Sequence, residues 1–116
     1  MYIVKKTIEI AGCHRLELPY ESKCAGLHGH NWIITVHCKS DQLNEAGMVV
    51  DFHDIKELVN KPLDHTYLND ILPFNPTAEN IARWICERVP HCFRVDVEES
   101  HNNTATYIRD EDLNLL

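Results

Sequence analysis

Alternating apolar and polar residues at both ends of the chain predict β-strands. Between Tyr2 and Ile10 the apolar side chains fall largely in phase, which predicts a strand leading to His14. Three more alternating runs follow, and a polar turn at His101–Asn103 joins the last two into a hairpin. The four predicted strands span residues 2–10, 28–38, 93–99 and 104–108.

Two apolar stripes with helical spacing occupy the middle of the chain. Asp51 precedes the first stripe and Thr77 the second, and both residue types accept hydrogen bonds from the free N–H groups of a first helical turn. We expect the first helix to end at Lys61–Pro62, because proline cannot donate to the helix ladder. The predicted inward residues are Phe52, Ile55, Leu58 and Val59 in the first helix and Ile81, Trp84 and Ile85 in the second.

The element order is therefore β-β-α-α-β-β. It predicts an α+β fold in which two helices cover one face of an antiparallel four-stranded sheet. We expect a single domain over residues 1–116, which is an ordinary domain length. The uncovered face of so small a sheet predicts that subunits associate.

Composition and charge disfavour some classes of partner. The net charge of −7 disfavours a nucleic-acid partner, because there is no basic stripe to neutralise phosphates. No apolar run approaches the length of a membrane span, so no membrane partner is expected. The chain has 5 cysteines, an odd number, and no CxxC pair. This pattern favours reduced thiols and a cytoplasmic location.

Histidines carry the strongest chemical signal. His28 and His30 are two residues apart on a predicted strand, so their imidazoles point to the same side. His14, at the end of the first strand, would add a third nitrogen. Three imidazoles with one open position are typical of catalytic zinc, although the ligand type also admits iron, nickel or copper.

Three further residues have side chains suited to proton transfer or binding. Cys24 lies between Lys23 and the histidine pair, so it is either an acid–base thiol or a fourth ligand that closes a structural site. Asp64 precedes His65, and a carboxylate beside an imidazole can orient it for proton transfer. Glu99 keeps the inward phase of its strand.

A buried carboxylate at Glu99 needs a partner. A ligand ring edge with two N–H donors is one choice, and a salt bridge to Arg94 or Arg83 is the other.

Six stretches occur in order along nearly the whole chain: AGCHRL at 11–16, CAGLHGHN at 24–31, GMVVDF at 47–52, PLDH at 62–65, NPTAEN at 75–80 and VDVEES at 95–100. Together they resemble the 6-pyruvoyl-tetrahydropterin synthase / 6-carboxy-tetrahydropterin synthase family. The resemblance is greatest to the bacterial 6-carboxy-tetrahydropterin synthases of queuosine biosynthesis. It implies the tunnelling fold, with subunits forming a homohexamer (a dimer of trimers) around a barrel of strands and active sites at subunit interfaces.

The resemblance also implies a role for each matching residue. His14, His28 and His30 would bind zinc (Zn²⁺), Cys24 would accept a proton, and Asp64 with His65 would complete the proton relay. Glu99 would anchor the pterin ring, while Thr77 and Glu79 would frame it. Cys13, where the family commonly has alanine, would place a second thiol near the metal.

The implied activity is a zinc-dependent carbon–carbon lyase. It would convert 7,8-dihydroneopterin triphosphate to 6-carboxy-5,6,7,8-tetrahydropterin, acetaldehyde and triphosphate. The segment from Glu99 to Asn103 resembles the pyruvoyl branch instead, in which triphosphate leaves and the side chain is retained. A pterin- or zinc-binding module without turnover and a small zinc hydrolase are the alternatives from other classes.

Overall fold

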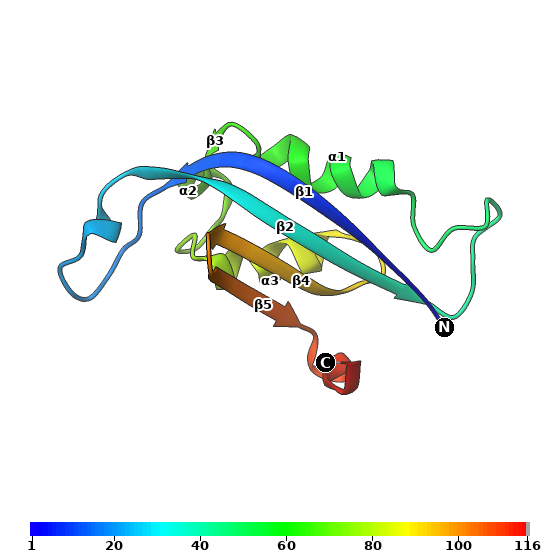
Figure 1. Cartoon of the computed structure of the whole chain (residues 1–116). Helices are drawn as coiled ribbons and strands as arrows, with labels where there is room; N and C mark the ends of the chain where they lie inside the picture. Colours follow the sequence, from blue (N-terminus) through cyan, green and yellow to red (C-terminus); the bar gives the residue numbers. More distant parts are fainter. Residues whose placement is uncertain (116) are drawn as a thin grey trace.

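One mixed β-sheet of five strands, in the order β3-β1-β2-β4-β5, forms the centre of the protein (Figure 1). The computed structural model describes residues 1–115, so Leu116, the last residue of the predicted domain 1–116, lies outside the described residues. The strands are β1 (Tyr2–His14), β2 (His28–Ser40), β3 (Thr66–Tyr67), β4 (Cys92–Ser100) and β5 (Asn103–Ile108).

The short strand β3 corrects the predicted sheet. It pairs in parallel with Gly12 and Cys13 of β1, so the expectation of four antiparallel strands was wrong, while the α+β class is confirmed. The four predicted strands are all present and pair antiparallel. A strand of two residues is too short to show an alternating pattern, so periodicity could not reveal it.

Both predicted helix caps are confirmed. The Asp51 carboxylate accepts from the His53 N–H group at 2.9 Å at the start of α1 (Phe52–Leu63). The Thr77 hydroxyl accepts from the Asn80 N–H group at 3.2 Å at the start of α3 (Ala78–Arg88). The remaining helical pieces are α2 (Leu68–Ile71) and two 3-10 turns, η1 (Lys23–Ala25) and η2 (Asp110–Leu115).

Helix α1 passes through Pro62 to Leu63, beyond its predicted end. Pro62 has no N–H group for the Leu58 carbonyl, which lies one helical turn earlier. Arg88 of α3 lies near that carbonyl instead, with Nε at 3.4 Å from the oxygen. The last turn of α1 therefore tolerates proline because another helix supplies the missing donor.

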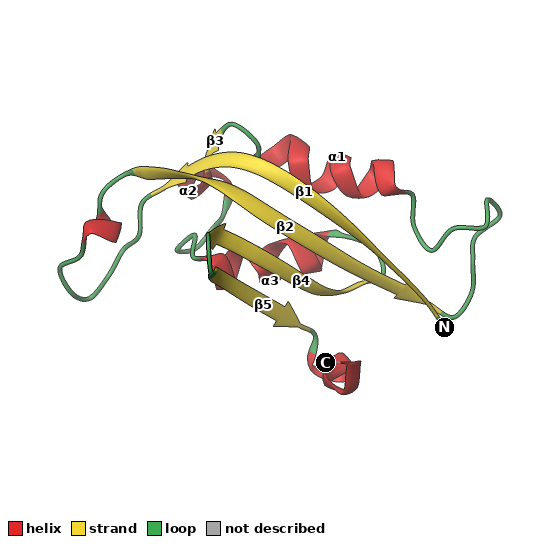
Figure 2. Ribbon diagram, in the orientation of Figure 1, coloured by secondary structure: helices red, strands yellow, loops and turns green. Residues whose placement is uncertain are grey.

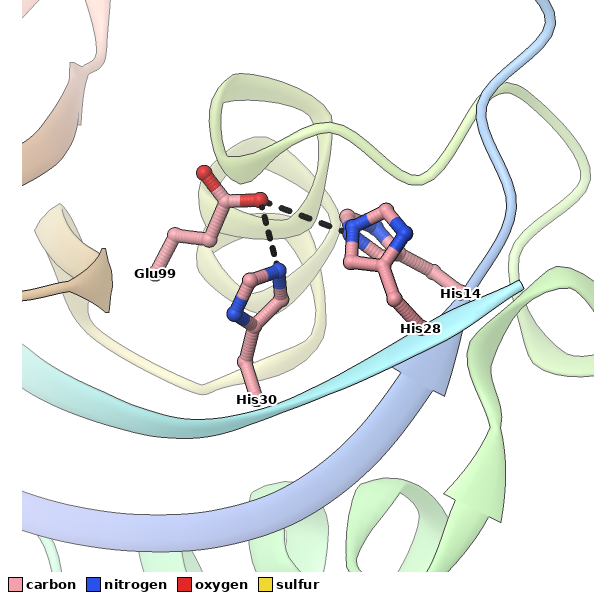
Figure 3. Close-up of side chains that lie close together, drawn as sticks. All are labelled: His14, His28, His30 and Glu99. Carbon is pink, nitrogen blue, oxygen red and sulfur yellow. Dashed lines mark hydrogen bonds and ion pairs between the residues drawn. The ribbon is translucent and has the colours of Figure 1, made fainter. Parts of the chain in front are cut away.

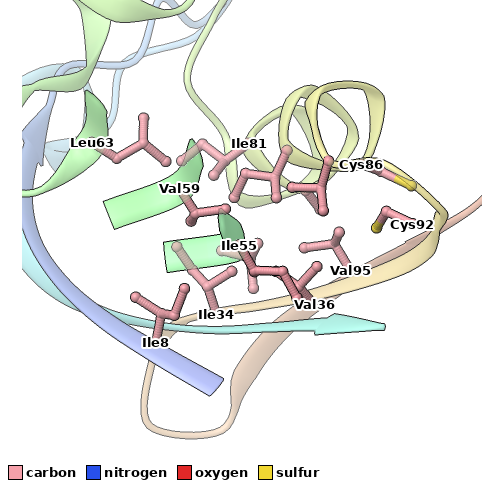
Figure 4. Close-up of a cluster of buried hydrophobic side chains, with 14 of the residues drawn as sticks. Ile8, Ile34, Val36, Ile55, Val59, Leu63, Ile81, Cys86, Cys92 and Val95 are labelled. Atoms are coloured by element: carbon pink, nitrogen blue, oxygen red, sulfur yellow. The ribbon is translucent and has the colours of Figure 1, made fainter. Parts of the chain in front are cut away.

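The two long helices lie on the same face of the sheet (Figure 2). Alternate residues of the strands, such as Ile34 and Val95, meet the apolar stripes of both helices in one core (Figure 4). Trp84 is only half-buried, and Phe52 is exposed, so those two predicted inward positions lie at or beyond the border of the core.

The opposite face of the sheet is polar. Its centre is Asp96, whose carboxylate accepts hydrogen bonds from His37 at 2.8 Å, Arg94 at 3.1 Å and Thr106 at 2.7 Å. Burial opposes ionisation of this carboxyl, but the three donors outweigh it and lower the pKa of Asp96. Whether subunit association covers this face, as expected, stays a prediction.

The five cysteines are free. Cys38, Cys86 and Cys92 are buried together, and the contact with the Cys38 thiol raises the pKa of Cys92 to about 12. Cys13 is half-buried on the opposite side of β1 from His14, with Sγ at 3.6 Å from the Thr66 carbonyl. The expectation of a second thiol near the metal was therefore wrong.

Within residues 1–115, none of the helices has both the length and the apolar character needed to cross a bilayer.

Candidate metal centre and active site

Strand register brings the three predicted histidines together. His14 is the register partner of His28 across the β1–β2 ladder, and His30 follows on the same face of β2. The three histidines lie where β1 ends and β2 begins, next to the connecting loop that projects beyond the helices (Figure 1). The His14 ring is fully buried, whereas His28 and His30 are half-buried.

Backbone carbonyls set the tautomers of two rings. His14 Nδ1 lies 2.8 Å from the Pro76 carbonyl, and His28 Nδ1 lies 2.7 Å from the Gly26 carbonyl. A carbonyl only accepts, so both Nδ1 atoms carry the proton and both Nε2 atoms present a lone pair. These Nε2 atoms are 2.9 Å apart. Two facing lone pairs at that distance suit a shared cation.

Burial lowers the pKa of His14, and the neighbouring His28 and His30 rings act in the same direction. The Pro76 carbonyl and Glu99 oppose that shift without overcoming it. His14 is therefore held as the neutral imidazole that metal ligation requires.

Trp32 forms the wall behind the histidines. Its fully buried ring meets His14 edge-on at 5.0 Å and His30 at 5.2 Å between centroids. The indole N–H group donates to the Gly12 carbonyl at 3.0 Å. Trp32 thus links the ring positions of two histidines to the backbone of β1.

A β-bulge delivers Glu99 to the same place. The register of β4 with β5 shifts between Glu98 and Ser100, so Glu99 is the extra residue. Its Oε1 lies 3.1 Å from His30 Nε2 and 3.4 Å from His14 Nε2 (Figure 3). The inward phase expected of Glu99 is confirmed, but its neighbours are imidazoles.

The alternative salt bridges for Glu99 are wrong. Arg94 pairs with Asp96 at 3.1 Å, and Arg83 pairs with Glu87 at 2.7 Å.

The donor set fits a metal ion. One ligand atom from each of His14, His28, His30 and Glu99 lies within 4.8 Å of the others. Tetrahedral ligands about 2 Å from a zinc ion lie a little over 3 Å from one another, which is close to these separations. The buried His30 Nε2 atom also lacks a well-aligned hydrogen-bond partner in the described part of the chain. A cation would satisfy it.

Cys24 lies beside this cluster but is not a member of it. Within residues 1–115, its Sγ is not among the ligand atoms grouped within 4.8 Å. The exposed thiol lines a cavity of about 400 Å³ together with Lys23, His28, His30 and Glu99. In this arrangement Glu99 is the fourth group of the cluster, and Cys24 faces the adjoining space.

Asp64 and His65 form the expected pair at the edge of the sheet. Asp64 Oδ2 lies 2.8 Å from His65 Nδ1, and Asp64 Oδ1 accepts the Ala11 N–H group at 2.8 Å. That backbone donor, aided by His65, holds the pKa of Asp64 below its usual range. His65 has φ 57°, and its N–H group donates to the Ala11 carbonyl at 2.6 Å. Its imidazole is exposed.

Within residues 1–115, neither Asp64 nor His65 lines the cavity described above for Cys24. His65 lines a separate cavity of about 560 Å³ with Cys13, Asn31 and Tyr67. His30 borders both cavities. One chain therefore assembles the histidines, Glu99 and Cys24 but leaves His65 outside the cavity that Cys24 lines.

Thr77 and Glu79 lie at the first turn of α3, where Thr77 serves as the cap. The preceding residue, Pro76, holds His14 with its carbonyl, but neither Thr77 nor Glu79 lines the cavity of Cys24. Sequence reasoning missed Pro76, since a backbone carbonyl leaves no side-chain signal. It also missed Trp32, although that residue shares the phase of His30 and could have been recognised from it.

Comparisons with known proteins agree with this fold. The model of the 6-pyruvoyl tetrahydropterin synthase family matches residues 3–110. A Synechocystis protein named 6-carboxy-5,6,7,8-tetrahydropterin synthase is 39% identical, with 92% of this chain and 93% of that protein covered. A Bacillus subtilis protein of the same name is 28% identical, with 90% and 83% covered.

Among solved structures, a Caenorhabditis elegans 6-pyruvoyl tetrahydropterin synthase superimposes with a TM-score of 0.75. It is 23% identical and the match covers 94% of this chain and 96% of that one, so it supports the fold alone.

The match to the family model spans nearly all of the sequence, and the Synechocystis relative is similar over almost its full length. The chain belongs to the 6-pyruvoyl tetrahydropterin synthase family.

Proposed function

We propose that this protein is a zinc-dependent carbon–carbon lyase acting on 7,8-dihydroneopterin triphosphate. With one water consumed, its products would be 6-carboxy-5,6,7,8-tetrahydropterin, acetaldehyde and triphosphate, in 7-deazaguanine (queuosine) biosynthesis. The observation that carries the proposal is the pair of facing Nε2 atoms of His14 and His28, 2.9 Å apart, with an exposed thiol lining the cavity beside them. The relatives named 6-carboxy-5,6,7,8-tetrahydropterin synthase support this choice of product.

His14, His28 and His30 would hold the zinc ion. When bound, zinc would supply Lewis acidity toward the hydroxyl groups of the substrate side chain. Cys24 would remove the proton from the adjacent carbon, as a thiolate does most readily near positive charge. Lys23, its neighbour in the same cavity lining, is one source of that charge.

His65, oriented by Asp64, would return a proton to the substrate. His65 does not line the cavity that Cys24 lines in one chain, so we propose that the relay would be drawn from two subunits. This division supports the predicted homohexamer with sites at subunit interfaces. Mixing inactive Cys24→Ala and His65→Ala subunits would restore part of the activity if the sites are shared, and none if each chain acts alone.

Glu99 would accept the N–H donors of the pterin ring edge, with Thr77 and Glu79 framing the ring. The carboxylate of Glu99 lines the cavity of Cys24, where a ring could reach it. Its present position beside His14 and His30 makes a competing role as a fourth metal ligand testable.

We propose that the protein is located in the cytoplasm. The free state of its five cysteines suits that reducing compartment.

The deciding experiment incubates the zinc-loaded protein with dihydroneopterin triphosphate and measures acetaldehyde, triphosphate and the pterin product. Acetaldehyde with a 6-carboxypterin supports the proposal. Triphosphate release with a retained three-carbon side chain assigns the pyruvoyl reaction instead. Absence of turnover, with zinc bound, assigns a pterin-binding or zinc-binding module.

A further inference from the structure

Two asparagine side chains hold the segment Arg15–Leu18, which follows β1 and pairs with no strand of residues 1–115. Asn69 accepts the Arg15 N–H group at 2.9 Å and donates to the Arg15 carbonyl at 2.8 Å. Asn75 does the same for Glu17, at 3.0 Å and 3.1 Å. An amide that holds both backbone groups of one residue takes the place of a peptide from a neighbouring strand.

These contacts extend the edge of β1 that β3 begins. Alternate residues of an extended chain present their N–H and C=O groups on the same edge. Ala11 uses this edge to bind Asp64 and His65, and Cys13 uses it to pair with β3. Arg15 and Glu17 continue the series. Residues 64–75 therefore carry both the Asp64–His65 pair and the two asparagines that fix the path of the chain beyond His14.

The other edge of the held segment reaches the turn of Cys24. Leu16, between the two clamped residues, donates its N–H group to the Cys24 carbonyl at 3.3 Å. The Cys24 N–H group in turn is bound by the Ser22 hydroxyl at 3.2 Å. Asn69 and Asn75 on one side and Cys24 on the other are thus joined through a single extended strand of backbone.

Both asparagines are themselves anchored. Asn69 lies in α2. The Asn75 carbonyl accepts from the Thr77 N–H group and from the Asn80 side chain, both at 2.9 Å, at the start of α3. The next residue, Pro76, holds His14. The same short loop therefore supports a metal ligand and the segment to which the Cys24 turn is attached.

We infer that Asn69 and Asn75 are positioning residues that hold the Cys24 turn beside the histidine cluster. The catalytic part of this inference rests on the role proposed for Cys24. Loss of either clamp leaves the metal ligands in place but frees the turn, so the thiol spends less time in reach of the substrate. Misplacement of a reacting group by about 1 Å can cost about 100-fold in rate.

The test compares Asn69→Ala and Asn75→Ala with Asn44→Ala. Asn44 is a matched control, because it binds the N–H groups of Ala46 and Met48 at 2.9 Å and 3.0 Å in the loop between β2 and α1. Hydrogen exchange of the Leu16 amide is measured without substrate. Steady-state kinetics follow on zinc-loaded protein, and the absorption spectrum of cobalt-loaded protein reports the metal ligands.

We expect Leu16 to exchange about tenfold faster or more in either clamp variant and to be unchanged in Asn44→Ala. We expect kcat to fall about tenfold or more while KM stays within about threefold and the cobalt spectrum is retained. Unchanged Leu16 exchange in both clamp variants overturns the inference. So does a kcat loss that only follows loss of the cobalt spectrum. If wild-type protein shows no turnover, the proposed function fails, and the exchange data still decide whether the clamp exists.

Discussion

Replacing Trp32 with phenylalanine tests whether the wall behind the histidines supports the metal site. The ring is fully buried, and its N–H group binds the Gly12 carbonyl at 3.0 Å. Phenylalanine keeps an aromatic ring but leaves that carbonyl without its donor, at a cost of about 1–3 kcal/mol. The smaller ring also leaves a void worth about 1 kcal/mol. The expected loss of unfolding free energy is therefore about 2–4 kcal/mol.

The same change should weaken metal binding. Trp32 meets the rings of His14 and His30 edge-on, so its loss lets both ligands reorient. Supporting contacts of this kind are worth about 10- to 100-fold in metal affinity. Urea denaturation measures the first effect, and a slope of about 2 kcal/mol per M predicts a midpoint about 1–2 M lower. Competition with a chromophoric chelator measures the second.

Trp84→Phe is the matched control. Trp84 is half-buried and its ring lies 4.6 Å from the Arg88 guanidinium carbon, a contact that phenylalanine can retain. All proteins are compared at one subunit concentration, because association adds to apparent stability. A Trp32→Phe variant with the urea midpoint and zinc affinity of Trp84→Phe would refute the reasoning.

Three other outcomes are expected. Cys24→Ala should abolish turnover while retaining zinc, whereas His28→Ala should lose both; zinc loss from the Cys24 variant, measured by metal analysis, would make the thiol a ligand. Glu99→Gln should retain zinc and raise KM about tenfold or more, since a charge-assisted hydrogen bond is lost, and zinc loss would identify a fourth ligand instead. The depressed pKa of Asp96 stabilises the fold above the unfolded carboxyl value of about 3.9, and this contribution disappears as pH falls through the folded value. The stability difference between wild type and Asp96→Asn should therefore shrink in acid, and a pH-independent difference in urea titrations would contradict this.

Much of the fold was predictable because long elements carry long patterns. The strands from Tyr2 and from His28, and the capped helices after Asp51 and Thr77, were all identified from periodicity and cap residues. Strand β3 was missed because two residues define no period. The end of α1 was misplaced because the donor that compensates for Pro62 comes from another helix.

The candidate site, like the fold, was predictable from the sequence only in part. The histidine cluster follows from strand phase, so the sequence was sufficient to bring His28 and His30 to one side. The inward phase of Glu99 was also predictable, but its place beside the histidines depends on a bulge, and the support from Pro76 depends on a backbone carbonyl. Neither a bulge nor a carbonyl leaves a side-chain pattern. The wrong expectation for Cys13 came from adjacency to His14 in sequence, which alternation of a strand turns into opposite faces.

The pairing of His14 with His28 in one hairpin has a consequence for the order of folding. All three imidazoles belong to the first two strands, so they meet through local contacts, which form early. The contacts of β2 with β4, such as Ile34 with Val97, join distant parts of the chain and form later. An isolated hairpin is only marginally stable, but a metal ion bound between its strands would cross-link them. We expect zinc present during refolding to speed the appearance of native sheet, and zinc added afterwards to have no such effect on the rate.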